Sequence, residues 1–255
     1  MKRALIAIAV TVASIGTPAF AADMPVKAPP APVVDWWTGL YVGANGGYSW
    51  GRWDSTSSVG IFPPGITGTT ASPDVKGWLG GFQAGYNWRI NSTWLAGLEG
   101  DIQWTGERAS STTGISIPLG DFVTTVTSDV DWKFAWFDTF RGRIGALIDP
   151  TTLIYLTGGA ALGKFEFSQF TTASISTIGG TVLASATAGS SESTTRWGGA
   201  VGAGVEKKFT ARWSAKAEFL YLDFGSHTFV TGSGIDTNVK LNDFIARAGV
   251  NLKLN

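Results

Sequence analysis

Hydrophobic and polar residues alternate with a period of two between Trp78 and Trp104. The apolar face of the first half consists of Trp78, Phe82, Ala84, Tyr86, Trp88 and Ile90. After Asn91-Ser92-Thr93 the alternation resumes, and the second apolar face consists of Trp94, Ala96, Leu98, Ile102 and Trp104. Side chains along a strand point alternately to its two faces. The pattern therefore predicts a β-hairpin with one apolar and one polar face.

Tryptophans stand at both ends of each apolar face, at Trp78 and Trp88 and again at Trp94 and Trp104. The ten residues from Trp78 to Trp88 correspond to a strand of roughly 33 Å at about 3.3 Å per residue. With a tilt of about 45° it rises roughly 23 Å, close to the ~25 Å apolar band that separates the aromatic girdles of membrane β-barrels. The spacing indicates a hairpin that crosses an outer membrane.

The same alternation recurs along the rest of the chain and predicts six further strands, within 38–50, 131–148, 152–167, 196–209, 212–222 and 241–255. Segments rich in Gly, Ser and Thr separate them, and these predict long loops at 51–76, 106–129, 168–195 and 223–240. The predicted fold is all-β: an eight-stranded antiparallel up-and-down transmembrane β-barrel with long extracellular loops and short periplasmic turns. A soluble sandwich or lipocalin-type barrel is the alternative, but it leaves the tryptophan positions unexplained.

Two strands have a less regular pattern than the others. In 131–148 the expected outward side chains are Trp132, Phe134, Trp136, Phe140 and Ile144. Asp138 falls on the same face, so we expect it near the membrane rim or beside a β-bulge. In 152–167 the expected outward side chains are Tyr155, Ala161, Phe165 and Phe167, which places Lys164 and Glu166 inside.

The N-terminal residues have the features of an export signal. Lys2 and Arg3 precede an apolar stretch, and Ala19-Phe20-Ala21 is a small-x-small cleavage site, so residues 1–21 are predicted to be a secretory signal peptide. Residues 22–36 form a Pro-rich periplasmic segment, and the barrel is expected to occupy 37–255. No run of 18 apolar residues follows position 21, so no helical membrane span is expected. Cleavage leaves 17 basic against 19 acidic residues, a balance that gives no reason to expect nucleic acid as a partner.

Five segments have a distinctive sequence: WTGLYVGANGGY at 37–48, TFRGRIG at 139–145, GAGVE at 202–206, AEFLYLDFG at 217–225 and RAGVN at 247–251. Together they resemble the small eight-stranded outer-membrane proteins of alpha-proteobacteria, including opacity-like surface antigens and haemin-binding outer-membrane proteins. The five segments, in this order, cover nearly the whole mature chain. The resemblance implies a Gram-negative cell outer membrane location and contact with the barrel-assembly machinery, which reads a C-terminal aromatic; this chain ends Leu252-Lys253-Leu254-Asn255 instead.

Charged residues on the polar faces are expected to point into the barrel. They are Arg89, Glu99, Asp101, Arg141, Arg143, Lys164, Glu166, Glu206, Lys208, Lys216, Glu218 and Arg247. The interior of an eight-stranded barrel is just wide enough for side chains to fill it. Buried charges persist when they are paired, so we interpret this set as a structural charge network that plugs the barrel. A selectivity lining or proton path is the alternative.

Few residues suggest other chemistry. His227 is the single histidine and the chain has no cysteine. The predicted loops supply no Tyr, Met or Cys to bind haem beside His227. No nucleophile and base stand in a recognisable motif, so we expect no enzyme activity, no metal site and no cofactor.

The favoured function is a structural, surface-exposed barrel that contributes to envelope integrity and surface interactions, with outer-membrane lipid and lipopolysaccharide as partners. A small porin-like diffusion channel and a haem-binding surface receptor are the alternatives.

Overall fold

The computed structural model describes residues 35–59, 70–71, 74–230 and 235–254. The predicted signal peptide and all but the last two residues of the Pro-rich segment lie outside them. In the described part of the chain, no helix is long and apolar enough to cross a membrane.

Strands account for almost all of the described residues. They are β1 (Gly39–Arg52), β2 (Asp54–Val59), β3 (Thr70–Ala71), β4 (Asp74–Arg89), β5 (Trp94–Leu119), β6 (Phe122–Asp149), β7 (Thr152–Thr177), β8 (Val182–Lys208), β9 (Trp213–Val230) and β10 (Ile235–Lys253).

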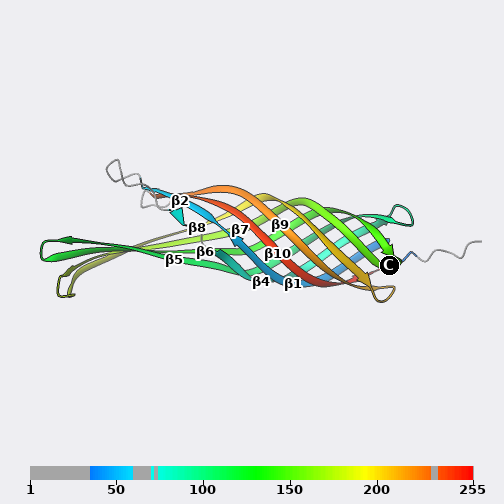
Figure 1. The fold of residues 1–255 in the computed structure, drawn as a ribbon, viewed down its shortest axis with the longest axis horizontal. Helices are drawn as coiled ribbons and strands as arrows, with labels where there is room; N and C mark the ends of the chain where they lie inside the picture. Colours follow the sequence, from blue (N-terminus) through cyan, green and yellow to red (C-terminus); the bar gives the residue numbers. More distant parts are fainter. Residues whose placement is uncertain (1–34, 60–69, 72–73, 231–234, 255) are drawn as a thin grey trace, which may run out of the picture. The chain divides into compact units, whose positions relative to one another are not determined.

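Eight of these strands form a closed antiparallel ring in the order β1-β4-β5-β6-β7-β8-β9-β10. The ring closes where β1 pairs with β10, from Tyr41 opposite Lys253 to Trp50 opposite Phe244. The short strands β2 and β3 extend the sheet beside β10. The strands are strongly tilted (Figure 1). The predicted eight-stranded up-and-down barrel is confirmed.

The two ends of the barrel differ in their connections. Short turns at 90–93, 150–151 and 209–212 join strands at one end, which we call the turn end. The opposite end, the hairpin end, carries the long connections. Exposed tryptophans form a girdle on the outer surface near each end of the barrel. The hairpin-end girdle consists of Trp50, Trp78, Trp104 and Trp197, and the turn-end girdle consists of Trp88, Trp94 and Trp213.

The connections predicted as loops at 106–129 and 168–195 are largely strand. β5 pairs with β6 out to Leu119 opposite Phe122, and β7 pairs with β8 out to Ser176 opposite Val182. β6 also pairs with β7 along this length, so the two hairpins form one four-stranded sheet that projects past the other strands (Figure 1). We call it the projecting sheet. The loop prediction was wrong because Ser and Thr were taken as loop residues, whereas Thr is also a β-branched strand former.

The tip of the β5–β6 hairpin explains how such long strands reverse. Only Gly120 and Asp121 separate Leu119 from Phe122. Gly120 has a φ of 63°, the left-handed conformation that two-residue hairpin turns require and that glycine adopts without a steric penalty. The turn therefore sets the register of the hairpin from its tip to the pairing of Glu107 with Phe134, where the register shifts.

A β-bulge changes the facing of β6. Phe134 pairs with Phe165 and Trp136 pairs with Lys164, so Ala135 is an extra residue against β7. One extra residue moves the following side chains to the other face. Phe140 and Ile144 face outward as predicted, but Trp132 and Phe134 are buried inside the barrel. Asp138 faces outward close to this bulge, as expected.

The predicted facing of β7 was wrong along its whole length. Tyr155, Ala161, Phe165 and Phe167 are at most 2% exposed and point inward. The alternate residues Ile154 and Leu156 face outward. Lys164 and Glu166 also lie on the outer face, with side chains about a third exposed. The prediction assumed that these two charges lie at membrane depth, but they stand beside the hairpin-end girdle, where an outward charge remains hydrated.

Candidate functional site: the barrel interior

Four cations and four acids meet in the middle of the barrel, and we call them the charge cluster. Its members are Arg141, Arg143, Lys216, Arg247, Glu99, Asp101, Glu206 and Glu218. Strict alternation on β5, β6, β8, β9 and β10 turns these side chains inward, because the apolar residues between them face outward. Each is at most 7% exposed. Equal numbers of each sign leave the cluster without net charge.

Arg141 pairs with three of the four acids. Its guanidinium lies 2.7 Å from Glu99, 2.8 Å from Asp101 and 3.0 Å from Glu218. Its Nε also donates to the hydroxyl of Thr139 at 2.9 Å. A buried arginine bonded in this way is held in one orientation, because every change of rotamer would strand a carboxylate.

Arg247 and Lys216 complete the pairing of the same acids. Arg247 Nη2 lies 2.6 Å from Glu218 and 2.9 Å from Asp101. Lys216 Nζ donates to both carboxylate oxygens of Glu99, at 2.7 and 2.8 Å. The result is a continuous network in which Glu99, Asp101 and Glu218 are each shared by more than one cation.

Arg143 forms the part of the cluster nearest the turn end. It donates to Glu206 at 3.0 Å and to Asn87 at 2.6 and 2.9 Å. Its guanidinium also lies between two aromatic rings, 4.8 Å from the centroid of Tyr41 and 5.3 Å from that of Tyr155. Cation–π contacts of this kind are strongest where water is excluded.

Two tyrosine hydroxyls add hydrogen bonds to carboxylates of the charge cluster. Tyr41 donates to Glu99 at 2.7 Å and Tyr155 donates to Glu218 at 3.1 Å. Glycine makes room for one of these rings: a Cβ at Gly204 would lie 2.5 Å from the Tyr155 hydroxyl. The sequence patterns did not identify either tyrosine. Tyr155 was placed outside, and a tyrosine on an inward face gives no distinctive signal.

Apolar side chains close the barrel above and below the charge cluster. Toward the turn end, Trp37, Leu95, Leu147, Leu153 and Tyr155 pack together. Toward the hairpin end lies a larger group that we call the apolar plug. It comprises Trp53, Val75, Leu79, Trp132, Phe134, Phe137, Ala161, Phe165, Phe167, Ala200, Leu220, Leu222, Phe224, Val239, Leu241 and Ile245.

A pair of acids lies at the level of the hairpin-end girdle, and sequence reasoning did not find it. Glu107 was assigned to a loop, but it is fully buried on β5 and accepts a hydrogen bond from Ser49 at 3.0 Å. Asp243 on β10 is 2% exposed, and its carboxyl group meets that of Glu107. Neither forms an ion pair with another described residue. Two buried carboxyl groups in contact are accommodated by a shared proton.

The remaining predicted interior charges lie apart from the cluster. Lys164 and Glu166 are on the outer surface, contrary to the prediction. Arg89 donates to the carbonyls of Asn91 and Ser92 in the adjacent turn, at 3.0 and 3.1 Å. Lys208 is buried at the turn end, where its ammonium lies 5.1 Å from the centroid of Trp37.

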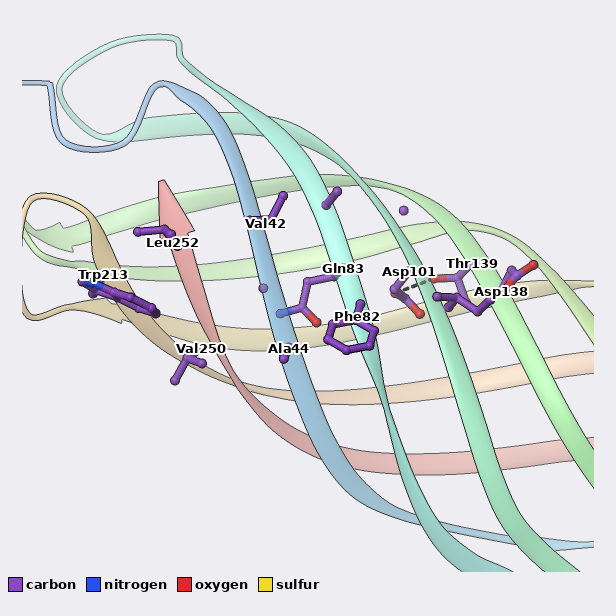
Figure 2. Close-up of a pocket in the computed structure, with 14 residues that line it drawn as sticks. Val42, Ala44, Phe82, Gln83, Asp101, Asp138, Thr139, Trp213, Val250 and Leu252 are labelled. Atoms are coloured by element: carbon purple, nitrogen blue, oxygen red, sulfur yellow. Dashed lines mark hydrogen bonds between the residues drawn. The ribbon is translucent and has the colours of Figure 1, made fainter. Parts of the chain in front are cut away.

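A hollow of about 830 Å³ lies on the outward surface of β1, β4, β5 and β6, with Trp213 and Leu252 at one edge. Figure 2 shows Val42, Ala44 and Phe82 on this side, whereas Gln83 and Asp101 belong to the interior face. The dashed line joins Asp101 to Thr139, whose hydroxyl donates at 2.8 Å. Apart from Asp138, the outward side chains that line the hollow are apolar.

His227 lies at the hairpin end, within 2.9 Å of Arg196 and 3.8 Å of Glu192. Its Nδ1 is therefore engaged with a guanidinium. Among the residues that the structure describes, no group of three or more His, Cys, Asp or Glu side chains is arranged to hold a metal ion.

Comparison with known protein families decides the identity of this barrel. The family model described as "Outer membrane protein beta-barrel domain" matches residues 7–251. The chain belongs to that family. As a member, it is an outer-membrane protein of Gram-negative type. The resemblance to small outer-membrane barrel proteins is thereby confirmed.

Relatives of this family member cover most of its length. The 31 kDa outer-membrane immunogenic protein of Brucella melitensis is 34% identical over 94% of this chain and 95% of its own. The 22 kDa outer membrane protein of Rhizobium leguminosarum bv. viciae is 27% identical over 78% of this chain and 69% of its own.

Solved structures with similar chains include two further outer-membrane proteins. OprG of Pseudomonas aeruginosa is 9% identical, with 86% of this chain and 98% of that chain covered and a TM-score of 0.47. The attachment invasion locus protein Ail of Yersinia pestis is 15% identical, with 84% and 99% covered and a TM-score of 0.32.

Proposed function

We propose that this protein is a non-conducting structural barrel that stabilises the outer membrane and holds the projecting sheet above the cell surface. The observation that carries the proposal is the filled interior. An ion that entered from the outside would have to displace the apolar plug, pass the acid pair and then break the charge cluster.

The energetics of the charge cluster support a plug rather than a pore. A water-filled channel screens the charges along its wall, and such charges seldom form buried networks with several partners each. Here Arg141 is 0% exposed and makes three ion pairs. Breaking a buried pair typically costs about 3–5 kcal/mol, so opening this layer would cost a large part of the stability of a small domain.

The projecting sheet supports a role in surface contacts. Its face that continues the barrel interior carries Ile115, Ile117, Leu119, Phe122 and Ile175 near the tip. The other face carries mainly Ser and Thr. Exposed apolar side chains on a regular sheet are typical of interaction surfaces. The relatives named immunogenic outer-membrane proteins are consistent with a barrel whose outer strands are accessible.

Planar-bilayer recording of the refolded protein tests the proposal. We expect no discrete conductance steps above the leak of the lipid alone. A porin of known conductance, refolded and recorded in the same way, is the positive control for detection. Regular conductance steps from the unmodified protein would refute the plug and favour the diffusion channel.

A deletion strain separates the two parts of the proposal. Complementation with the full chain should restore resistance to detergents. A chain in which 112–129 and 170–189 are each replaced by a two-residue Asn-Gly turn keeps the barrel but lacks the projecting sheet. It should restore envelope resistance without restoring surface contacts. Failure of both chains to restore resistance would contradict the envelope role.

A further inference from the structure

Three cations stand side by side on the outer surface of adjacent strands. Lys76 on β4 is the direct cross-strand partner of Arg108 on β5, and Arg108 is the direct partner of Lys133 on β6. Directly opposed residues point to the same face, with Cβ atoms roughly 5 Å apart. We call Lys76, Arg108 and Lys133 the cation row.

The side chains next to the cation row establish that it faces away from the barrel interior. Val75, Glu107 and Trp132 precede the three cations, and each of these residues is at most 4% exposed and turned inward. Lys76 and Arg108 are exposed, and the Lys133 side chain is 39% exposed. The cation row therefore lies on the outer surface of the barrel.

The cation row lies next to the hairpin-end girdle, at the height where membrane hydrocarbon meets the lipid headgroups. On β4, Lys76 is two residues beyond Trp78 toward the hairpin end, and Trp50 on β1 is its cross-strand partner. On β6, Lys133 lies beyond Trp136, across the Ala135 bulge. Tryptophans of a membrane barrel mark the boundary between hydrocarbon and headgroups. The cation row thus lies where the phosphates of the outer leaflet are found.

The ion pairs within the described residues do not neutralise the row. Glu166 pairs with Lys133 at 3.1 Å, but it is also shared with Lys164 at 3.4 Å. Asp74 pairs with Arg52 at 3.2 Å. Lys76 and Arg108 form no ion pair with a described residue. Like charges placed directly opposite each other on a sheet are destabilising, so the arrangement favours an anion that bridges them.

A hollow adjoins the row on the same surface. It has a volume of about 460 Å³ and is lined by Arg108, Lys133, Ser110, Ser168, Asp131 and Glu166 among others. The two hydroxyls are suitable donors for phosphate oxygens. The two acids stand beside the cations and limit how many anions the hollow can hold.

From these observations we propose that the cation row is a binding site for the phosphate groups of an anionic, phosphorylated glycolipid of the outer leaflet. Arg108 at the centre binds a phosphate through its guanidinium, and Lys76 and Lys133 supply charge from either side. The acyl chains of the same lipid would lie against the apolar surface below the girdle. The site deepens the proposed structural role and rests on it for the outward orientation of the hairpin end.

Binding of bisphosphorylated lipid A to the refolded, detergent-solubilised protein tests the site, with native mass spectrometry as the readout. The test variant is the triple substitution Lys76→Gln, Arg108→Gln, Lys133→Gln. The matched control is Lys207→Gln, Arg212→Gln, Lys240→Gln, which removes the same charge from exposed positions outside the row. We expect the test variant to bind at least tenfold more weakly and the control to stay within twofold of the unmodified protein.

Two further binding measurements identify the chemical group that binds the cation row and the molecule that carries this group. Lipid A stripped of its phosphates should bind the unmodified protein and the test variant equally. Inorganic phosphate at millimolar concentration should not displace lipid A, because it lacks the acyl chains; complete displacement would identify a site for free phosphate and overturn the lipid assignment. Equal affinities of the test variant and the unmodified protein for bisphosphorylated lipid A would overturn the proposal as a whole.

Urea unfolding in bilayers distinguishes loss of the lipid site from misfolding of the triple variant. In zwitterionic lipid alone, the test variant should unfold at the same or a higher urea concentration than the unmodified protein, because the repulsion within the row is gone. Added lipid A should reverse that order. An unchanged order would refute the site. A conducting barrel could still pass this test, so failure of the non-conducting role is distinguishable from failure of the lipid site.

Discussion

Arg141 and Glu99 are direct cross-strand partners on β6 and β5, and Arg141 Nη2 lies 2.7 Å from Glu99 Oε1. Both side chains are at most 3% exposed. Their pairing joins two neighbouring strands, whereas the bond from Arg141 to Glu218 at 3.0 Å reaches across the barrel to β9. One guanidinium thus links strands from opposite sides of the ring.

Arg141→Ala should destabilise the barrel by about 3–5 kcal/mol, because it leaves Glu99, Asp101 and Glu218 buried with fewer cations. Urea unfolding in lipid measures the change. Arg89→Ala is the control, since Arg89 bonds only turn carbonyls and should cost about 1 kcal/mol or less. Unchanged stability of Arg141→Ala together with altered conductance would instead indicate a water-filled interior.

Phe134→Ala should cost about 3–5 kcal/mol, because it opens a cavity in the apolar plug. The Phe134 ring is stacked on Phe165 with centroids 4.6 Å apart. Phe140→Ala on the same strand removes a ring that is 64% exposed on the outer surface, and it should cost clearly less. The same unfolding measurement compares the two. A larger loss for Phe140→Ala would contradict the position of the β6 bulge.

The projecting sheet should resist proteases along its strands on intact cells. Backbone groups in 110–117 and 170–175 are paired in a regular ladder, so cleavage should be confined to the tips at 119–122 and 178–181. Mass spectrometry of the released and retained fragments locates the cuts. Efficient cleavage throughout 168–195 would show that this segment is the loop that its Ser and Thr content suggests.

The turn between β6 and β7 should show an acid-sensitive hydrogen bond. The Thr151 hydroxyl and amide each donate to Asp149 at 2.7 Å, and these bonds lower the pKa of its carboxyl group to about 2. A carboxyl pKa that is lower in the folded state stabilises the turn above the ordinary pKa of about 3.9, and the stabilisation is lost as the pH falls toward 2.

Thr151→Val should raise the Asp149 pKa toward its ordinary value, and NMR titration of the carboxyl group in detergent micelles measures it. Thr93→Val in another turn is the control and should leave Asp149 unchanged. An Asp149 midpoint that does not move in Thr151→Val would mean that the hydroxyl contributes nothing.

The sequence by itself determined the class of fold, the position of the membrane and most inward charges. Alternation on β5, β8, β9 and β10 follows from the pleat of a strand, which any residue obeys. Glu99, Glu206, Lys216 and Arg247 could therefore be placed inside before any contact was known. The spacing of the tryptophans fixed the height of the apolar band, because strand rise per residue is nearly constant.

Only the tertiary structure decided where the alternation breaks and how far it extends. The Ala135 bulge appears only in the pairing of β6 with its neighbour, which local patterns do not record. The inward facing of β7 places the Tyr155 hydroxyl 3.1 Å from Glu218, a residue 63 positions away. The projecting sheet and the cation row likewise arise from pairing between strands. Lys76, Arg108 and Lys133 are far apart in sequence, and the ring brings them together.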